Sequence, residues 1–295
     1  MSWWNGSEED NVAAALTKVA GPVTEKGAGR WSVSLWNGAV HPVEARLDDG
    51  WLALQAAGWD HRVAPWDLLR ANAGLTGLAR FVLEEVPSVT TLQAEIPVGG
   101  DDLPAELEAA CAGLRQALEL EPDAPAAPPS PPEDRPDLAR LCAEAGWPFE
   151  ERDGGTLSVE LETADMPLRA RLEDEADGGL RLQAALLQTR TLGSPGRQAV
   201  ATALLATSAT VRMVRAYAAE EGDEVQTGFE VRLSCAAEPA TLDHALAALS
   251  VSCGLCVLEA RALQEETLAQ RYLEVRGYAP NSLSQLGCSS GAGGS

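Results

Sequence analysis

The residues that could support catalysis are few and scattered in this chain. Cys253 and Cys256 form a C-x-x-C pair. Such a pair serves redox chemistry when it lies at a helix N-terminus, where the helix dipole lowers a thiol pKa. Here it lies inside the apolar run ALAALSVSCGLCVLEARAL, which predicts the middle of a helix. A structural role is therefore favoured, and a thiol-dependent enzyme remains as an alternative.

Other reactive groups do not form a recognisable site. A zinc site would need two more ligands, and the sequence contains no second C-x-x-C and no H-x-x-x-H. The histidines are His41, His61 and His244, and none has helical spacing to a cysteine. Motifs for phosphate binding, dinucleotide binding, acyl transfer and zinc proteolysis are also missing. We expect no metal, no cofactor and no catalytic residue.

Two pairs of acidic residues occupy similar places in the chain. They are Asp48 with Asp49, and Glu173 with Asp174. A pair of carboxylates can act as general acid and base when their pKa values are pushed apart. Both pairs stand beside turn sequences, so we interpret them as turn residues and a solvated face.

Two similar stretches of the sequence indicate the helices and strands that must position these residues. HPVEARLDDGWLALQAA, residues 41–57, resembles MPLRARLEDEADGGLRLQAAL, residues 166–186. Pro42 and Arg46 match Pro167 and Arg171, and the run LQAA occurs in both stretches. The extra residues of the second stretch fall in EDEADGG, a turn, where insertions are tolerated. The chain is therefore predicted to be a tandem duplication of one domain.

Each copy is predicted to be an α+β domain with the element order α-β-β-β-α-β-β-α. Alternating residues such as Trp31, Val33 and Leu35 predict strands with one buried face, and the DDG at 48–50 predicts a hairpin turn. Antiparallel sheets with helices packed on one face follow from this order. A single last helix is expected to begin near Thr241 and to reach toward Val275.

Composition divides the chain into four parts. The segment EPDAPAAPPSPPEDRP is a proline-rich spacer, since proline fixes φ and removes a donor. The predicted domains are a first copy at 1–120, a linker at 121–136, a second copy at 137–279 and a Ser/Gly-rich, disordered tail at 280–295.

Charge and composition exclude some partners and locations. The net charge is −22 and is shared about equally by the two halves, which disfavours nucleic acid and anionic membrane surfaces. No apolar run reaches the length of about 20 residues that spans a bilayer, and MSWWNGSEED lacks the features of a secretory signal. We expect a cytoplasmic protein whose six cysteines are reduced.

The order of elements resembles the type III secretion chaperone fold, the Tir-chaperone and YbjN-like superfamily. The residues that carry the resemblance are the hairpin VEARLDDGWLALQAA, then LLRANAGLTGLARFVLEE with Asn72, then LQAEIP and the closing helix. The second copy lacks an equivalent of Asn72. The resemblance implies an acidic binding protein that holds a partner segment in extended form. Because such chaperones are usually dimers, two copies in one chain look like an intrachain pseudo-dimer.

The tryptophans indicate where a partner would bind. Seven of the eight lie before residue 67. Trp36 and Trp51 are out of phase with the inward residues of their strands, so they are predicted to face away from the helices of their own copy. Large aromatic side chains on an open sheet face contact another element or bind a partner. Contact with the other copy or the N-terminal arm and contact with an external partner both remain open.

The function expected from these features is non-enzymatic binding of a protein or an extended peptide by a chaperone or adaptor. Apolar partner residues would be buried on the sheet face, and an acidic rim would select basic or neutral segments. The alternative is a structural or regulatory subunit whose open faces are buried permanently in a larger assembly.

Overall fold

The computed structural model describes ten segments of the chain. These are residues 8–36, 39–56, 63–84, 89–99, 103–119, 137–163, 166–175, 179–222, 224–234 and 237–278. The predicted linker at 121–136 and the predicted tail at 280–295 lie outside them.

The two halves of the chain have the same order of helices and strands, except that the second half adds a 3₁₀ turn and the helix α7. The first half contains α1 (Glu8–Ala20), β1 (Thr24–Gly27), β2 (Arg30–Trp36), β3 (Val40–Asp48), β4 (Trp51–Ala56), α2 (Pro65–Gly74), β5 (Arg80–Glu84), β6 (Val89–Pro97) and α3 (Leu103–Glu119). The second half contains α4 (Leu138–Glu144), β7 (Phe149–Glu151), a 3₁₀ turn (Asp153–Gly155), β8 (Leu157–Leu161), β9 (Leu168–Asp174), β10 (Leu180–Gln188), α5 (Ser194–Thr210), β11 (Arg215–Glu221), β12 (Glu224–Leu233), α6 (Pro239–Ala262) and α7 (Glu266–Val275).

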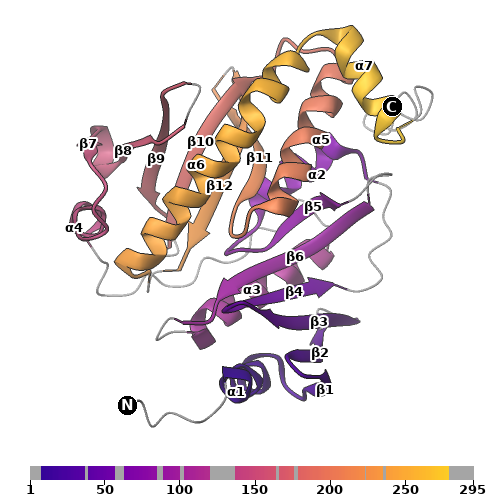
Figure 1. Ribbon diagram of the computed structural model, residues 1–295, viewed down its shortest axis with the longest axis vertical. Helices are drawn as coiled ribbons and strands as arrows, with labels where there is room; N and C mark the ends of the chain where they lie inside the picture. The colour runs from indigo at the N-terminus through magenta and orange to yellow at the C-terminus, as the bar shows by residue number, and fades with distance from the viewer. Residues whose placement is uncertain are drawn as a thin grey trace, which may run out of the picture.

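Each half forms a six-stranded antiparallel sheet, and the two sheets have the same strand order (Figure 1). The first sheet is ordered β1-β2-β3-β4-β6-β5, and the second is ordered β7-β8-β9-β10-β12-β11. In each sheet the last two strands form a hairpin, and the second of them, β6 or β12, pairs with the preceding strand of the sheet. The predicted α+β class, with antiparallel sheets and a duplicated arrangement of elements, is confirmed.

The predicted hairpin around the DDG turn forms between β3 and β4. β3 and β4 pair from Asp48 opposite Trp51 to Val43 opposite Ala56. Asp49 and Gly50 form the two-residue turn with φ values of 51° and 74°. Both values are positive, as a type I′ turn requires, and Asp-Gly is a preferred sequence for that turn.

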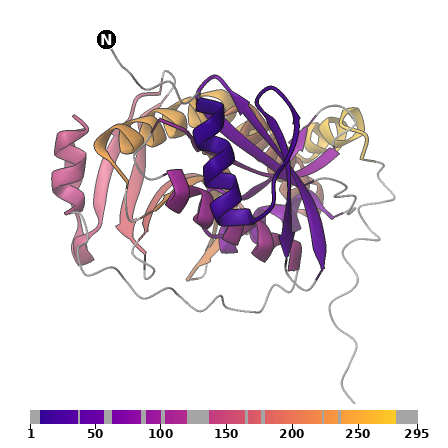
Figure 2. The same cartoon turned by 90° about the horizontal axis from the view of Figure 1, so that it is seen from below.

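α1, α3 and α6 cover the buried face of the sheet of their own half. In the first half, α1 and α3 pack together against the sheet (Figure 2). They cover the predicted inward residues Trp31, Val33 and Leu35, which are all buried. In the second half, α6 packs across β8, β9, β10 and β12. α6 is long and apolar enough to cross a membrane by length and composition, and half of that stretch is buried inside the protein.

α2 and α5 join the halves. α2 of the first half packs against β11 of the second half, and α5 of the second half packs against β5 of the first. The two helices also contact each other, and the edge strands β5 and β11 come together. This reciprocal packing was not predicted, because an amphipathic pattern shows that a helix buries one face but does not show which sheet it covers.

Two features differ from the sequence-based expectation. Each half has four strands before its middle helix where three were predicted, because β1 and β7 are short edge strands without apolar alternation. The predicted last helix is divided into α6 and α7. Glu265 caps the N-terminus of α7, because its carboxylate accepts hydrogen bonds from the backbone N–H groups of Thr267 and Leu268. The helix is therefore interrupted before this residue.

Candidate functional site

A cleft of about 350 Å³ lies where the two halves meet. We refer to it as the seam cleft. Its apolar lining comes from the start of β4, the segment between α2 and β5, the start of α3, the turn between α5 and β11, and the end of β12. The residues are Trp51, Leu78, Leu103, Met213 and Leu233. Neither half could form the cleft alone.

The rim of the seam cleft is acidic. Glu8, Glu106 and Glu238 lie on it, together with His244. Glu106 of the first half accepts a hydrogen bond from the hydroxyl of Ser234 in the second half. An apolar cleft with an acidic rim favours an apolar group that carries a positive charge beside it.

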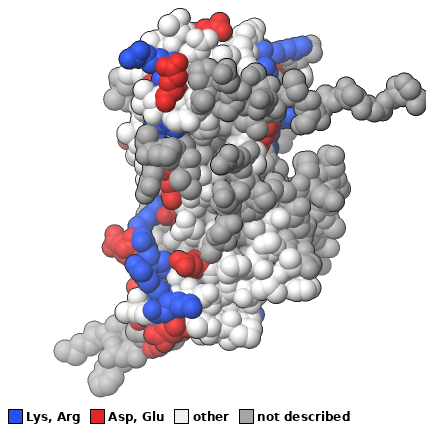
Figure 3. All heavy atoms as spheres, turned by 90° about the vertical axis from the view of Figure 1, so that its right-hand side faces the viewer, with Lys and Arg blue, Asp and Glu red and all other residues white. Residues whose placement is uncertain are grey.

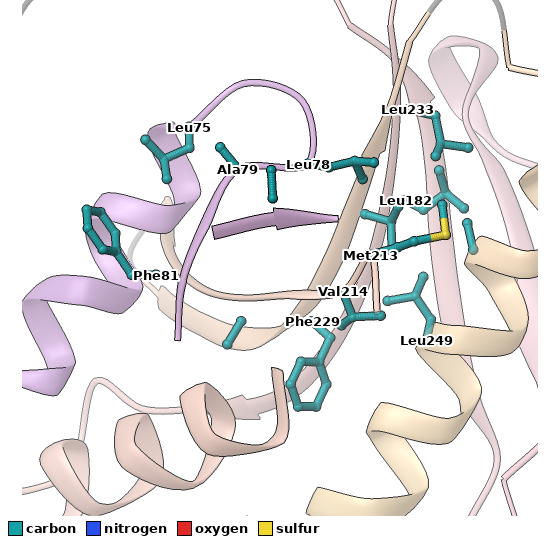
Figure 4. Packing of buried hydrophobic residues seen from close by; sticks show 14 of the residues in the cluster. Leu75, Leu78, Ala79, Phe81, Leu182, Met213, Val214, Phe229, Leu233 and Leu249 are labelled. Atoms are coloured by element: carbon teal, nitrogen blue, oxygen red, sulfur yellow. The ribbon is translucent and has the colours of Figure 1, made fainter. Parts of the chain in front are cut away.

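Leu78 and Met213 connect the seam cleft to the hydrophobic core. Leu78 of the first half points toward the second half, where Leu182 and Met213 gather (Figure 4). Met213 is almost fully buried and has a left-handed backbone, with a φ of 67°. That conformation costs about 1 kcal/mol for a residue with a side chain, so tertiary packing must hold it in place.

Trp51 is positioned by an arginine from the other half. The guanidinium of Arg212, in the turn between α5 and β11, lies 5.3 Å from the centroid of the Trp51 ring. Arg212 also lies 3.3 Å from a carboxylate oxygen of Asp48 and 3.9 Å from one of Glu95. These contacts keep the half-buried indole against the core at one side of the seam cleft.

Trp36 lies elsewhere on the molecule. Its side chain is 66% exposed, and Val40, its partner across β2 and β3, is 62% exposed. Trp36 pairs with the first residue of β3, while Trp51 pairs with the last. β3 has nine residues, so the two tryptophans are roughly 26 Å apart at about 3.3 Å per residue. The structure therefore separates the two predicted partner-binding residues.

The open face of the first sheet is polar between these two tryptophans. Arg46 and Gln55 are exposed there, and so are Ser34 and Glu44. Figure 3 shows acidic and basic side chains next to each other along one edge of the molecule. The expected apolar sheet face is thus reduced to the Trp36–Val40 pair at one end and Trp51 at the other.

Asn72 is a buried hydrogen-bonding link across the seam. Its amide nitrogen donates to the carbonyl oxygen of Phe81 at 3.0 Å and to that of Ala216 at 2.9 Å. Its oxygen accepts from the backbone N–H of Phe81 at 2.7 Å. Phe81 belongs to β5 and Ala216 to β11, so one side chain satisfies backbone groups of both edge strands.

A buried ion pair reinforces this link from the second half. Arg215 contacts Glu230 at 2.8 Å. The same guanidinium donates to the carbonyl oxygen of Ala79, in the first half, at 2.9 Å. Burial would raise the pKa of Glu230, but the charges of Arg215, Arg232 and Arg181 outweigh that effect and lower it. Burial lowers the pKa of Arg215 to about 10, so the guanidinium stays charged at neutral pH.

An equivalent pair in the first half was missed by sequence reasoning. Arg80 begins β5 and forms an ion pair with Glu95 on β6. Arg215 begins β11 and pairs with Glu230 on β12. Both residues of the pair recur at the same spacing along the chain. That recurrence was the signal that could have found them.

The cysteines are placed as the sequence predicted. Cys253 and Cys256 lie in the middle of α6 and are fully buried. Burial raises the pKa of each thiol to about 12, with a further contribution from Cys256 on Cys253. The other described thiols, Cys111 and Cys142, are also buried, which raises each pKa to about 11. None of these four thiols is a thiolate at neutral pH. Cys235 and Cys288 lie outside the described residues.

Histidines and acids do not gather into a metal site among the described residues. His41 lies on β3 and His244 near the start of α6, whereas His61 is not described. The two acidic pairs form ion pairs with arginines instead. Asp48 contacts Arg212, and Glu173 contacts Arg171 at 2.8 Å.

Comparison with known protein families finds a similarity in the second half of the chain. Residues 134–255 match the YbjN family model, whose description is "putative bacterial sensory transduction regulator". The match extends from just before α4 into α6 and includes all of the second sheet. No curated protein and no solved structure matches the chain. The relation of the first half to this domain rests on its identical strand order.

Proposed function

We propose that this protein is a non-enzymatic regulator or adaptor that binds a segment of another protein in the seam cleft. The observation that carries the proposal is a cleft whose apolar lining comes from both halves and whose rim is acidic. The regulatory description of the YbjN family agrees with a binding role. The buried, protonated thiols of the described chain speak against the thiol-dependent alternative.

The bound segment would be short and would carry an apolar side chain beside lysine or arginine. The apolar side chain would lie between Trp51, Leu78 and Met213. The positive charge would lie near Glu8, Glu106 or Glu238, where complementary charge favours encounter and orientation. Trp36 and Val40 would form a separate, secondary contact.

The two halves would act as a covalently linked pseudo-dimer. The reciprocal packing of α2 on β11 and of α5 on β5 supports this view. So does the presence of an Arg–Glu pair at the start of the last hairpin in each half. Only the first half supplies Asn72 and Trp51, so the pair would be asymmetric and would offer one cleft.

Affinity purification with mass spectrometry tests the proposal. The baits are the wild-type protein, a Trp51→Ala variant and a Trp36→Ala variant, each checked for an unchanged fold by circular dichroism. We expect a specific partner to be retained by the wild type and by Trp36→Ala and to be lost by Trp51→Ala. Loss with Trp36→Ala alone would place recognition at the β2–β3 tip and overturn the assignment to the seam cleft.

A further inference from the structure

The outward face of α6 carries large apolar side chains that are exposed in the described part of the chain. Val251, Leu255 and Leu258 are 52%, 61% and 59% exposed, whereas the opposite face of their helix is buried in the core. In Figure 1, α6 lies along the outer side of the second half with no helix or strand drawn over its front. Large apolar side chains that are exposed together on one helix face indicate a contact surface.

The outward residues of α6 have the spacing by which two helices pack side by side. Outward positions recur at Ala240, His244, Ala247, Val251, Gly254 and Leu258, alternately four and three residues apart. That is the heptad pattern by which one helix packs along another. Small residues occupy one set of positions, and larger residues occupy the other.

In the first half, the counterpart of α6 is α3, and another helix covers it. There α1, with 13 residues, packs along α3. In the second half α4 has seven residues. The hydrogen bond from the Trp147 indole, just after α4, to Asp243 shows that its contact lies near the start of α6. The rest of the outward face of α6 has no equivalent of α1 among the described residues.

We propose that a second copy of this chain covers this face, through an antiparallel pairing of α6 with α6 around a twofold axis. In that arrangement Val251 packs against Gly254 of the second copy, and Leu258 packs against Ala247 of the second copy. Each large residue thus meets a small one. A twofold axis makes both contacts occur twice, as a self-complementary interface requires.

The charges at the two ends of α6 fit the same arrangement. Asp243 lies near the start of the helix and Arg261 near its end, and both are exposed on the same edge of the apolar face. They are about 27 Å apart along one helix at 1.5 Å per residue, so they cannot pair within one chain. Antiparallel pairing brings Asp243 of each copy to Arg261 of the other.

The interface would be small, because one helix from each copy buries less than the roughly 800 Å² per partner of standard interfaces. We therefore expect a reversible dimer with a dissociation constant in the micromolar range. Ala240 and His244 at the start of α6 also line the seam cleft, but Val251, Gly254 and Leu258 do not. Leu258→Glu therefore tests the dimer without changing the cleft, and the dimer and the proposed partner binding can fail separately.

Sedimentation velocity of the full chain across a concentration series tests the dimer. The wild type should shift from monomer to dimer, and Leu258→Glu should weaken the association at least tenfold. Asp243→Arg and Arg261→Asp should each weaken it about threefold or more. The double variant Asp243→Arg/Arg261→Asp should recover it, since the exchanged charges meet again across the axis. Glu224→Gln, an exposed change on β12, is the matched control and should leave association unchanged.

Several results would overturn the proposal. If the wild type is monomeric at all concentrations, a second copy does not cover the outward face of α6. If Leu258→Glu still forms the dimer, the dimer interface lies elsewhere on the molecule. Failure of the charge exchange to restore association excludes the antiparallel register. A monomeric wild type that sediments with vesicles of neutral phospholipid would assign the α6 face to a lipid surface instead.

Discussion

The amide nitrogen of Asn72 in the first half lies 2.9 Å from the carbonyl oxygen of Ala216 in the second half. Both groups are buried, and the same amide also bonds to Phe81. The side chain therefore links the edge strands of the two sheets by direct hydrogen bonds. Its place between β5 and β11 explains why a polar residue occupies the inner side of α2.

Replacing Asn72 should destabilise the joined halves. In Asn72→Asp, the two donated hydrogen bonds are lost and a carboxylate faces two backbone carbonyl oxygens. We expect the free energy of unfolding to fall by about 3 kcal/mol. Urea unfolding followed by circular dichroism measures the loss. Asn11→Asp, at an exposed position on α1, is the matched control and should change stability by less than about 0.5 kcal/mol. Equal effects of the two changes would show that Asn72 does not support the seam.

Removing the charge of Glu230 should have a larger effect than removing that of a partly exposed glutamate. Glu230→Gln leaves the buried Arg215 without its carboxylate partner. Uncompensated buried charge costs about 3–5 kcal/mol. Glu173→Gln also removes a carboxylate that contacts arginines, but Glu173 is 25% exposed and should lose no more than about 1 kcal/mol. Chemical denaturation at pH 7 compares the two, and similar losses would contradict a special role for Glu230.

The same carboxylate predicts a pH dependence of stability. The pKa of Glu230 is lower in the folded protein than in the unfolded chain, because arginine charges outweigh burial. Its contribution is therefore present above the ordinary glutamate pKa and is lost as the pH falls through the lower folded value. The difference in unfolding free energy between the wild type and Glu230→Gln should shrink from pH 7 toward pH 3. A difference that is the same at every pH would show that the carboxylate is not ionised in the folded state.

The described cysteines should be unreactive in the folded protein. The test uses a Cys235→Ser/Cys288→Ser variant, which retains only the four buried thiols at positions 111, 142, 253 and 256. Their raised pKa values and burial predict that a thiol-specific disulfide reagent at pH 8 reacts with them only after denaturant is added. Rapid reaction of one thiol in native conditions would revive the thiol-dependent alternative.

The sequence predicted the elements that repeat an apolar pattern. The β3–β4 hairpin, the inward residues of β2 and the position of Cys253 within α6 all followed from spacing and turn residues. β1 was missed because its residues TEKG are all exposed, so no buried face marks it as a strand. The break between α6 and α7 was missed because Glu265 ends one helix by capping the next, without glycine or proline.

The site was harder to predict than the fold because it depends on how the halves meet. Trp51 was selected as an outward aromatic residue, but its contact with Arg212 required knowledge of the packing of α5 and β11. Met213 has no sequence feature that indicates a left-handed backbone. The Arg80–Glu95 and Arg215–Glu230 pairs could have been found by comparing the two halves beyond the first hairpin.

Hydrogen–deuterium exchange of the full chain, with and without the partner recovered by affinity purification, tests the central claim most directly. The seam cleft as the binding site predicts slower exchange on binding at the β3–β4 turn beside Trp51 and at the turn that contains Arg212 and Met213. Slower exchange confined to the ends of β2 and β3 near Trp36 and Val40, with the seam unchanged, would contradict it.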